Sequence, residues 1–422
     1  MDSKVKADEF LIAHNFSISI ADKLHQKIFS DMQTGLKTGG ADQAMIKAGS
    51  AVIRNIKAGE SVIVIDAGGT NFRSCLVTKT NNGLEVSDFE KTSMPAIDHK
   101  LNKKEFYKAI ADNISRLKDS ADKISFCFSY AMAITEDGDG KIIRFSKEVK
   151  APEAVGTYLG KELLSELKIQ GWKKVKKINV LNDTTALLLS SFVEAGRKNY
   201  KSHIAFILGT GMNSAYINKG QIIVTECGMF SDLYQSDFDL RVCSHTTEPG
   251  KSLLEKMTSG AYLGDLAFEM INSAYQENIF SKAFAEEFSK LSFVSTADFD
   301  QILLPRQTSD SKKIMTSHLM PALEKGTSED SQILKTFLES IITRSAFLTA
   351  EAIYAAILDT DKNEKDSAAP VAIACNGSTF WKTPLLKEKV ESRLKELLPT
   401  DFEIIKIDDD ITKGSFAAAF IQ

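Results

Sequence analysis

The first residues whose types and spacing suggest chemistry form a glycine turn after an apolar run. Residues 61–79 read SVIVIDAGGTNFRSCLVTK, and Asp66 ends a strand-like segment just before the Gly68-Gly69-Thr70 turn. Such a turn can be an ordinary hairpin connection, because glycine adopts backbone angles that other residues resist. Its N–H groups can also cradle phosphate oxygens, while a carboxylate beside them holds Mg²⁺, usually through water. One turn does not decide between these interpretations.

A second turn of the same plan follows about one domain length later. Residues 203–220 read HIAFILGTGMNSAYINKG, in which an apolar strand enters the turn Gly209-Thr210-Gly211 and another strand leaves it. In both segments an asparagine and a strand follow the turn, which suggests two related halves of the chain. Two such turns facing each other could hold one polyphosphate between them.

Further polar residues lie where apolar strands end or helices begin. They are Ser129, Ser146, Lys147, Asn182, Asp183, Asn213, Glu226 and Glu255. Each has an ordinary structural interpretation, since Asn182 or Asp183 can cap the helix that begins there, and Glu255 can be a solvated charge. As a group, however, they supply the paired donors and acceptors that a sugar needs. A carboxylate, a cation and backbone donors are also what phosphoryl transfer requires.

Motifs that would indicate other chemistry are incomplete. The PGKS of residues 249–252 lacks the first glycine of a P-loop, because His245 stands there. The DGDG of residues 137–140 lacks carboxylates at the first and twelfth positions of a calcium loop, so we interpret it as a turn. The six histidines show no metal-binding spacing, and neither a G-x-S-x-G nor a G-x-G-x-x-G is present.

Composition is that of a soluble globular protein. The 422 residues suffice for two domains, or three, and 43% are hydrophobic and 26% charged. The net charge of −4 argues against general binding to nucleic acid or an anionic membrane. The five cysteines are scattered without a C-x-x-C, which favours reduced thiols and a cytoplasmic location. We find neither a signal peptide nor an apolar stretch of the ~20 residues that span a bilayer.

Periodicity predicts mixed strands and helices in two sequential blocks. Strands are expected at 61–66, 72–79, 84–90, 124–129, 178–182, from 203 onward, and at 371–375 and 403–407. Helices are expected over 1–58, at 103–117, 152–168 and 183–196, over most of 250–357, and at the C-terminal end. This pattern predicts an α/β protein of two domains, and a cleft between domains is the usual place for a ligand.

Taken together, these stretches resemble the hexokinase family of the actin-like ATPase, or ribonuclease H-like, superfamily. DAGGTNFRSCLV resembles the family's first phosphate motif, LNDTTALLL its catalytic-base motif and LGTGMNSAY its second phosphate motif. TECGMF and PGKSLLEKMTSGAYLGDL resemble its sugar-binding stretches, and CNGSTF is a shorter match to its adenosine motif. The chain departs from the family at Ser129-Tyr130-Ala131, where Ser-Phe-Pro is usual, and at Cys227, which occupies a tryptophan position.

The resemblance implies a role for each matching residue. Asp183 would be the general base at the 6-hydroxyl of a sugar, and Lys147 would meet both the sugar and the phosphoryl group. The sugar ligands would be Ser129, Ser146, Lys147, Asn182, Asp183, Asn213, Glu226 and Glu255. ATP would contact Asp66, Gly68, Gly69, Thr70, Asn71, Arg73, Gly209, Thr210, Gly211, Gly377, Ser378, Gly414 and Ser415. Asp66 would lie near Mg²⁺, through water.

The resemblance also implies an architecture and an activity. Each of two domains would hold a mixed sheet flanked by helices, with a deep cleft between them. The small domain would take 60–182 and about 411–422, and the large domain 1–59 and 183–410. The implied reaction moves the γ-phosphoryl group of ATP to the 6-hydroxyl of a hexose, with D-glucose as first candidate. Mannose, fructose or an amino sugar, or a slow sugar sensor, are the alternatives, and the protein would be a monomer or homodimer.

Overall fold

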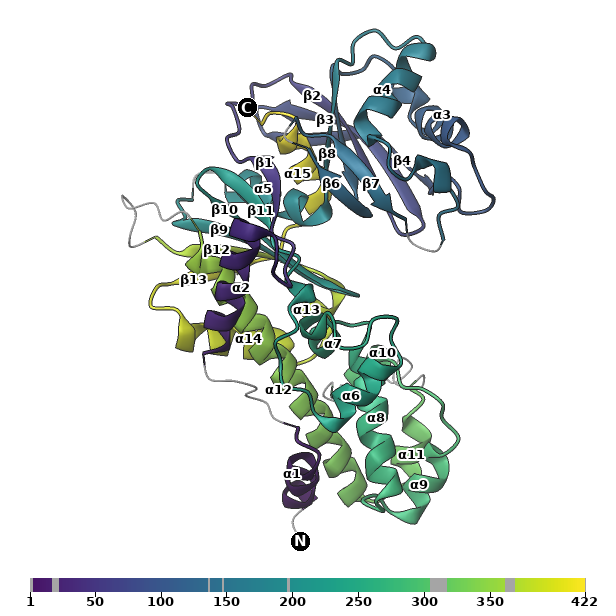
Figure 1. Cartoon of the computed structure of the whole chain (residues 1–422), viewed down its shortest axis with the longest axis vertical. Coiled ribbons are helices and arrows are strands. Elements are labelled where there is room, and N and C mark those ends of the chain that lie inside the picture. Colours follow the sequence, from purple (N-terminus) through teal and green to yellow (C-terminus); the bar gives the residue numbers. More distant parts are fainter. Residues whose placement is uncertain are drawn as a thin grey trace.

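Two β-sheets organise the chain (Figure 1). The computed structural model describes residues 3–16, 23–135, 137–145, 148–195, 198–303, 317–360 and 369–421. We call the sheet with strand order β4-β3-β2-β5-β8 the first sheet, and the sheet with order β1-β11-β10-β9-β12-β13 the second sheet. This confirms the predicted α/β class with mixed sheets flanked by helices.

The first sheet begins with an antiparallel meander and continues with parallel strands. Its strands are β2 (Ser61–Gly68), β3 (Asn71–Thr80), β4 (Gly83–Ser93), β5 (Lys123–Phe128) and β8 (Lys177–Leu181). Successive residues of a strand point to opposite faces, and both faces of β2 are buried. Ile63 and Ile65 lie in the core that includes α3 (Lys103–Asn113) and α4 (Leu159–Ile169). The other face is covered by α15 (Asp410–Ala418).

The second sheet lies between two helical layers. Its strands are β1 (Ile46–Ser50), β9 (Ser202–Leu208), β10 (Met212–Asn218), β11 (Gln221–Val224), β12 (Val371–Asn376) and β13 (Phe402–Ile405). Ile204 and Phe206 of β9 pack into the larger core with the long helix α12 (Ser328–Leu358). Ala205, between them, faces the core formed by α5 (Asp183–Ala195) and α15. The small side chain at this position lets α5 lie close to the sheet.

The remaining helices extend the molecule beyond the second sheet (Figure 1). They are α1 (Ser3–Ala13), α2 (Leu24–Thr38), α6 (Asp237–Ser244), α7 (Leu253–Thr258), α8 (Leu263–Gln276), α9 (Lys282–Phe288), α10 (Thr296–Leu303), α11 (Met320–Lys325), α13 (Ser378–Lys382) and α14 (Leu386–Leu397). By length and composition alone α12 could cross a membrane, but most of its apolar stretch is buried inside the fold. Its apolar residues are therefore accounted for by the core.

Two expectations about elements were wrong, and one hairpin was not foreseen. The N-terminal region is not helical throughout, because 46–50 form the edge strand β1. The helix expected from 152 begins only at Leu159, after the short 3₁₀ turn Pro152–Ala154. A hairpin of β6 (Ala131–Ile134) and β7 (Gly140–Arg144) was not foreseen, although the DGDG turn within it was. The domain boundaries stay a prediction, since the sheets alone do not define them.

Candidate active site

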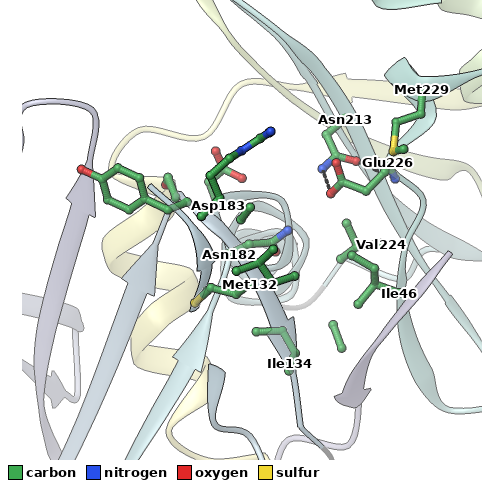
Figure 2. Close-up of a pocket in the computed structure, with 15 residues that line it drawn as sticks. Ile46, Met132, Ile134, Asn182, Asp183, Asn213, Val224, Glu226 and Met229 are labelled. Atoms are coloured by element: carbon green, nitrogen blue, oxygen red, sulfur yellow. Dashed lines mark hydrogen bonds between the residues drawn. The ribbon is translucent and has the colours of Figure 1, made fainter. Parts of the chain in front are cut away.

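A cavity of about 520 Å³ opens between the two sheets (Figure 2). Five of the predicted sugar ligands line it, namely Ser129, Asn182, Asp183, Asn213 and Glu226. Ser129 follows β5, and Asn182 and Asp183 lie at the junction of β8 and α5, so that the carboxyl ends of two parallel strands bring them together. Asn213 lies on β10, and Glu226 follows β11. The second sheet therefore supplies the other side of the cavity.

Asn182 and Asp183 combine helix capping with exposure to the cavity. The Thr185 N–H donates to Asn182 Oδ1 at 2.8 Å, which is the contact of an N-cap residue. The Thr184 N–H and hydroxyl donate to Asp183 Oδ1 at 2.7 and 3.2 Å. Both contacts go to one carboxylate oxygen, and they fix the orientation of the side chain. Asn182 is thus a helix cap, as one interpretation of the sequence predicted. This capping does not exclude a role of Asp183 as general base.

The environment makes Asp183 a stronger base than an ordinary aspartate. Burial raises the pKa of its carboxyl, the hydrogen bonds from Thr184 oppose that rise, and the negative charge of Asp66 adds to it. The carboxyl therefore binds a proton more readily than a solvated aspartate does. This is the direction that general-base catalysis requires.

Asn213 and Glu226 form a rigid pair across the cavity from Asp183 (Figure 2). Asn213 Nδ2 donates to Glu226 Oε1 at 2.6 Å, and the Glu226 N–H donates back to Asn213 Oδ1 at 3.1 Å. The Ser214 N–H also donates to Asn213 Oδ1, at 2.7 Å. Burial raises the pKa of Glu226, which the Asn213 amide opposes and the charges of Asp183 and Glu255 increase. The pair offers fixed acceptors to sugar hydroxyls.

Glu255 does not line the cavity but holds the strand that carries Asn213. Its Oε2 accepts the Met212 N–H at 3.0 Å, and burial raises its pKa against the effect of that donor. A Cβ atom on Gly211 would lie 2.8 Å from the same oxygen. Glycine at this position therefore makes room for Glu255, which is a more specific role than the phosphate contact expected from the sequence.

The first glycine turn is a hairpin that presents its tip to solvent. Gly68 pairs with Asn71, so Gly69 and Thr70 form the two-residue connection, and both are exposed. The Tyr130 hydroxyl donates to Gly69 O at 2.6 Å, and Arg73 Nη1 donates to Asp66 Oδ2 at 2.6 Å. The segment is therefore a β-hairpin, as one interpretation of the sequence predicted. Binding of phosphate by the exposed N–H groups of its tip stays a prediction.

The residues around this turn fit a magnesium ion that is bound chiefly by other groups. Among the described residues, no three or more His, Cys, Asp or Glu side chains are arranged to hold a metal ion. Mg²⁺ commonly uses one or two protein carboxylates and completes its shell with water and substrate phosphates. Asp66, a partly exposed carboxylate beside the turn, is suited to that arrangement.

A second cavity, of about 290 Å³, lies beside the second glycine turn. It is lined by Thr210, Gly260, Ala261, Thr296, Ala297, Ser378, Thr379, Lys382 and Thr383. Gly209 O accepts both the Gly260 N–H and the Thr379 hydroxyl at 2.8 Å, which ties the β9–β10 turn to α13. Gly377, with φ of 109°, directly precedes α13, and its Cα lies 3.6 Å from the position that a Cβ on Gly209 would take. The predicted Thr210 and Ser378 thus come together.

Other site predictions had different outcomes. Ser146 and Lys147 lie outside the described residues. Gly414 and Ser415 are buried in α15, where a Cβ on Gly414 would overlap the Ala186 carbonyl of α5, so close helix packing accounts for the glycine. The ATP contact expected for the two residues stays a prediction.

Several cavity residues were not foreseen. They are Ile46, Ala48, Tyr130, Ala131, Met132, Ile134, Ile143, Arg144, Val224 and Met229 around the larger cavity. Most are apolar and lie on β1, β11 and the β6–β7 hairpin, and two of these elements were themselves not foreseen. Arg144, two residues before Ser146, is the member that its sequence neighbourhood could have indicated.

Comparison with known proteins agrees with this geometry. Two sequence profiles, each described as hexokinase, match residues 6–193 and 203–421. Hexokinase-2 of Homo sapiens is 23% identical over 98% of the chain, which spans 48% of that relative's length. Glucokinase-1 of Kluyveromyces lactis is 25% identical over 77% of the chain and 76% of its own length. The chain therefore spans about half of the human relative and most of the yeast one.

The fold is shared with solved hexokinases. The Schistosoma mansoni hexokinase complexed with glucose superimposes with a TM-score of 0.76 at 22% identity, over 99% of this chain and 98% of that one. A further hexokinase crystal structure gives 0.78 at 19% identity, over 100% and 98%. Together the two hexokinase profiles cover nearly all of the chain. The chain therefore belongs to the hexokinase family.

Proposed function

We propose that this protein is an ATP-dependent hexokinase that phosphorylates the 6-hydroxyl of a hexose, with D-glucose as first candidate. The observation that carries the proposal is Asp183, oriented by Thr184 and facing a cavity whose opposite side holds the Asn213–Glu226 pair. Membership of the hexokinase family and the glucose complex of the Schistosoma mansoni protein support it.

In the proposed reaction each part of the site has one task. Asn213 and Glu226 hold the sugar hydroxyls, which leaves the 6-hydroxyl for Asp183. Asp183 accepts the hydroxyl proton late, as a loose phosphoryl transition state develops, because a carboxylate is too weak to deprotonate an alcohol beforehand. Donors of the two glycine turns bind the phosphates, and the smaller cavity beside Ser378 receives the nucleoside.

Magnesium would neutralise charge on the nucleotide phosphates. Asp66 would hold it through water, and the Arg73 guanidinium keeps that carboxylate oriented beside the turn. We place the reaction in the cytoplasm, as expected from the cysteine content.

The decisive experiment is a coupled assay of ADP release with purified protein, Mg²⁺-ATP and a panel of hexoses. Glucose, mannose, fructose and glucosamine are compared at equal concentration, with Asp183→Ala as the matched inactive control. Sugar-dependent ADP release that disappears in this variant supports the proposal. Sugar binding by calorimetry without turnover on any hexose would instead favour a sugar sensor.

A further inference from the structure

Asp410 is a buried carboxylate that the roles assigned so far do not use. It is the first residue of α15, is 7% exposed, and accepts a hydrogen bond from Asn376 Nδ2. Burial raises the pKa of its carboxyl, and the hydrogen bond from Asn376 opposes this rise. The negative charges of Asp183 and Asp66 make smaller contributions that raise the pKa further. Placing a carboxylate there is costly, so a compensating function is worth seeking.

Asn376 also contacts the turn beside the smaller cavity. It is the last residue of β12, and its Oδ1 accepts the N–H of Gly377. Gly377 holds φ at 109°, and a Cβ there would lie 2.1 Å from Leu208 O, so only glycine fits at this position of the turn. One amide side chain thus joins the turn that precedes Ser378 to the carboxylate of Asp410.

The two ends of this contact belong to different sheets. Asn376 and Gly377 extend from the second sheet, whereas Phe416 and Phe420, at the far end of the α15 segment, pack on β2 and β3 of the first sheet. Asp66 lies on β2, at the first glycine turn. The contact between Asn376 and Asp410 therefore links the turn beside the smaller cavity to the first sheet, which carries the first glycine turn.

We propose that Asp410 is a positioning residue for the nucleotide. It acts through Asn376, whose amide holds the Gly377 turn in the conformation that binds the nucleotide. The proposal rests on the proposed kinase function, because it assigns the smaller cavity to ATP. The carboxylate fixes which end of the Asn376 amide faces the Gly377 N–H. Without it the amide can rotate and present its NH₂ group to that N–H, two donors that repel each other.

The test compares steady-state kinetics of wild type, Asp410→Ala, Asp410→Asn and Asn376→Ala. Asp410→Ala is expected to raise KM for ATP about tenfold or more, the range for a lost hydrogen bond to a charged group, and to leave KM for the hexose within twofold. Asp410→Asn keeps an acceptor oxygen and should restore most of the loss. The double variant Asp410→Ala/Asn376→Ala should be no worse than either single one, because both remove the same contact. The exposed Asp408→Ala, two residues upstream, is the matched control.

A readout that does not need turnover is available in the helix that follows the turn. Trp381 lies in α13, and its Nε1 donates to Cys375 O at 3.0 Å. In a Trp172→Phe background, Trp381 is the one remaining tryptophan of the two in the sequence. Asp410→Ala should shift its emission in the absence of nucleotide, and Asp410→Asn should not.

The outcomes separate this proposal from the proposed function. A wild-type protein without hexose phosphorylation defeats the kinase function, and the Trp381 emission then reports on the turn alone. Equal rises of both KM values, an unchanged KM for ATP, or no recovery in Asp410→Asn would overturn the positioning role in an active enzyme. Unchanged Trp381 emission in Asp410→Ala would overturn it in either case.

Discussion

At the scale of single residues, Asp183 serves catalysis at the expense of stability. Its folded-state pKa is raised above that of the unfolded chain, for which about 3.9 is the reference value. The protonated form is therefore favoured by the fold. The stability it contributes is fully present below the unfolded pKa and is lost as the pH rises through the folded pKa. At neutral pH the ionised side chain destabilises the protein.

Asp183→Asn should consequently be more stable and nearly inactive. The amide has no charge to bury, so Tm should exceed that of wild type at pH 7.5, and the difference should vanish near pH 3. Turnover should fall by about 10²–10⁴-fold, because no general base remains. Differential scanning calorimetry at both pH values and the ADP-release assay measure the two effects. Asp98→Asn, at an exposed position, serves as control and should change neither. A lower Tm at pH 7.5 would contradict the argument.

The same raised pKa predicts the acidic limb of the pH–rate profile. Asp183 must be ionised to accept the proton, so kcat should fall as the pH drops through its folded pKa, which lies above the ordinary aspartate range. Measurement at saturating sugar isolates this group, because protonation of Glu226 and Glu255, whose pKa values are also raised, acts on sugar binding. A kcat that stays constant down to about pH 4, the ordinary range, would count against Asp183 as the base.

At the scale of elements, the β9–β10 turn positions sugar ligands as well as phosphate donors. Gly211 leaves the space that Glu255 occupies, whereas a Cβ on Gly209 would make only ordinary contacts, the nearest at 3.6 Å. Gly211→Ala should displace the Glu255 carboxylate, release the Met212 N–H and raise KM for the hexose about tenfold. Gly209→Ala, in the same turn, is the matched control and should leave that KM unchanged. Equal effects of the two substitutions on sugar affinity would refute this division of roles.

The elements differ in how far the sequence could predict them. Strands such as 61–66 are continuous apolar runs buried on both faces, and their signal is strong. β1 reads IKAGS, contains a single large apolar residue, and is a strand because it pairs with β11 at the sheet edge. Tertiary pairing outweighed propensity there. The apolar wall of the larger cavity was missed for the same reason, since it depends on that strand and on the β6–β7 hairpin.

The polar half of the site was better predicted than its supports. Asn182, Asp183, Asn213 and Glu226 stand at strand ends, where the sequence shows them directly, and they line one cavity. Their partners are set by packing between distant segments. The contact of Asp410 with Asn376 spans 34 residues and leaves no local pattern. For Gly414, expected from the sequence to contact ATP, the close approach to Ala186 depends on helix packing and leaves no local signal.

At the scale of the whole molecule, ligands on two sheets suggest that a sugar draws the sheets together. Ser129 and Asp183 come from the ends of the first sheet, and Asn213 and Glu226 from the second. A sugar that touches both sides favours a closed form, which would also exclude water from the reaction. Saturating glucose should therefore reduce the radius of gyration in small-angle scattering.

The control for closure is Glu226→Ala, which removes a sugar ligand of the second sheet. At the same glucose concentration, the radius of gyration of this variant should decrease much less than that of the wild type. ATP hydrolysis without sugar should also be orders of magnitude slower than sugar phosphorylation, because the open form that water enters lacks the assembled catalytic site. A scattering curve that glucose leaves unchanged in the wild type, with binding confirmed by calorimetry, would exclude closure.

The position of α15 has a consequence for biosynthesis. Phe416 and Phe420 cover Val62, Val64 and Val77 of β2 and β3, strands that leave the ribosome some 340 residues earlier. At about 5–20 residues per second, that apolar face waits tens of seconds for its cover. During translation it is a natural target for chaperones, and a messenger truncated near codon 400 would yield a chain that exposes it permanently.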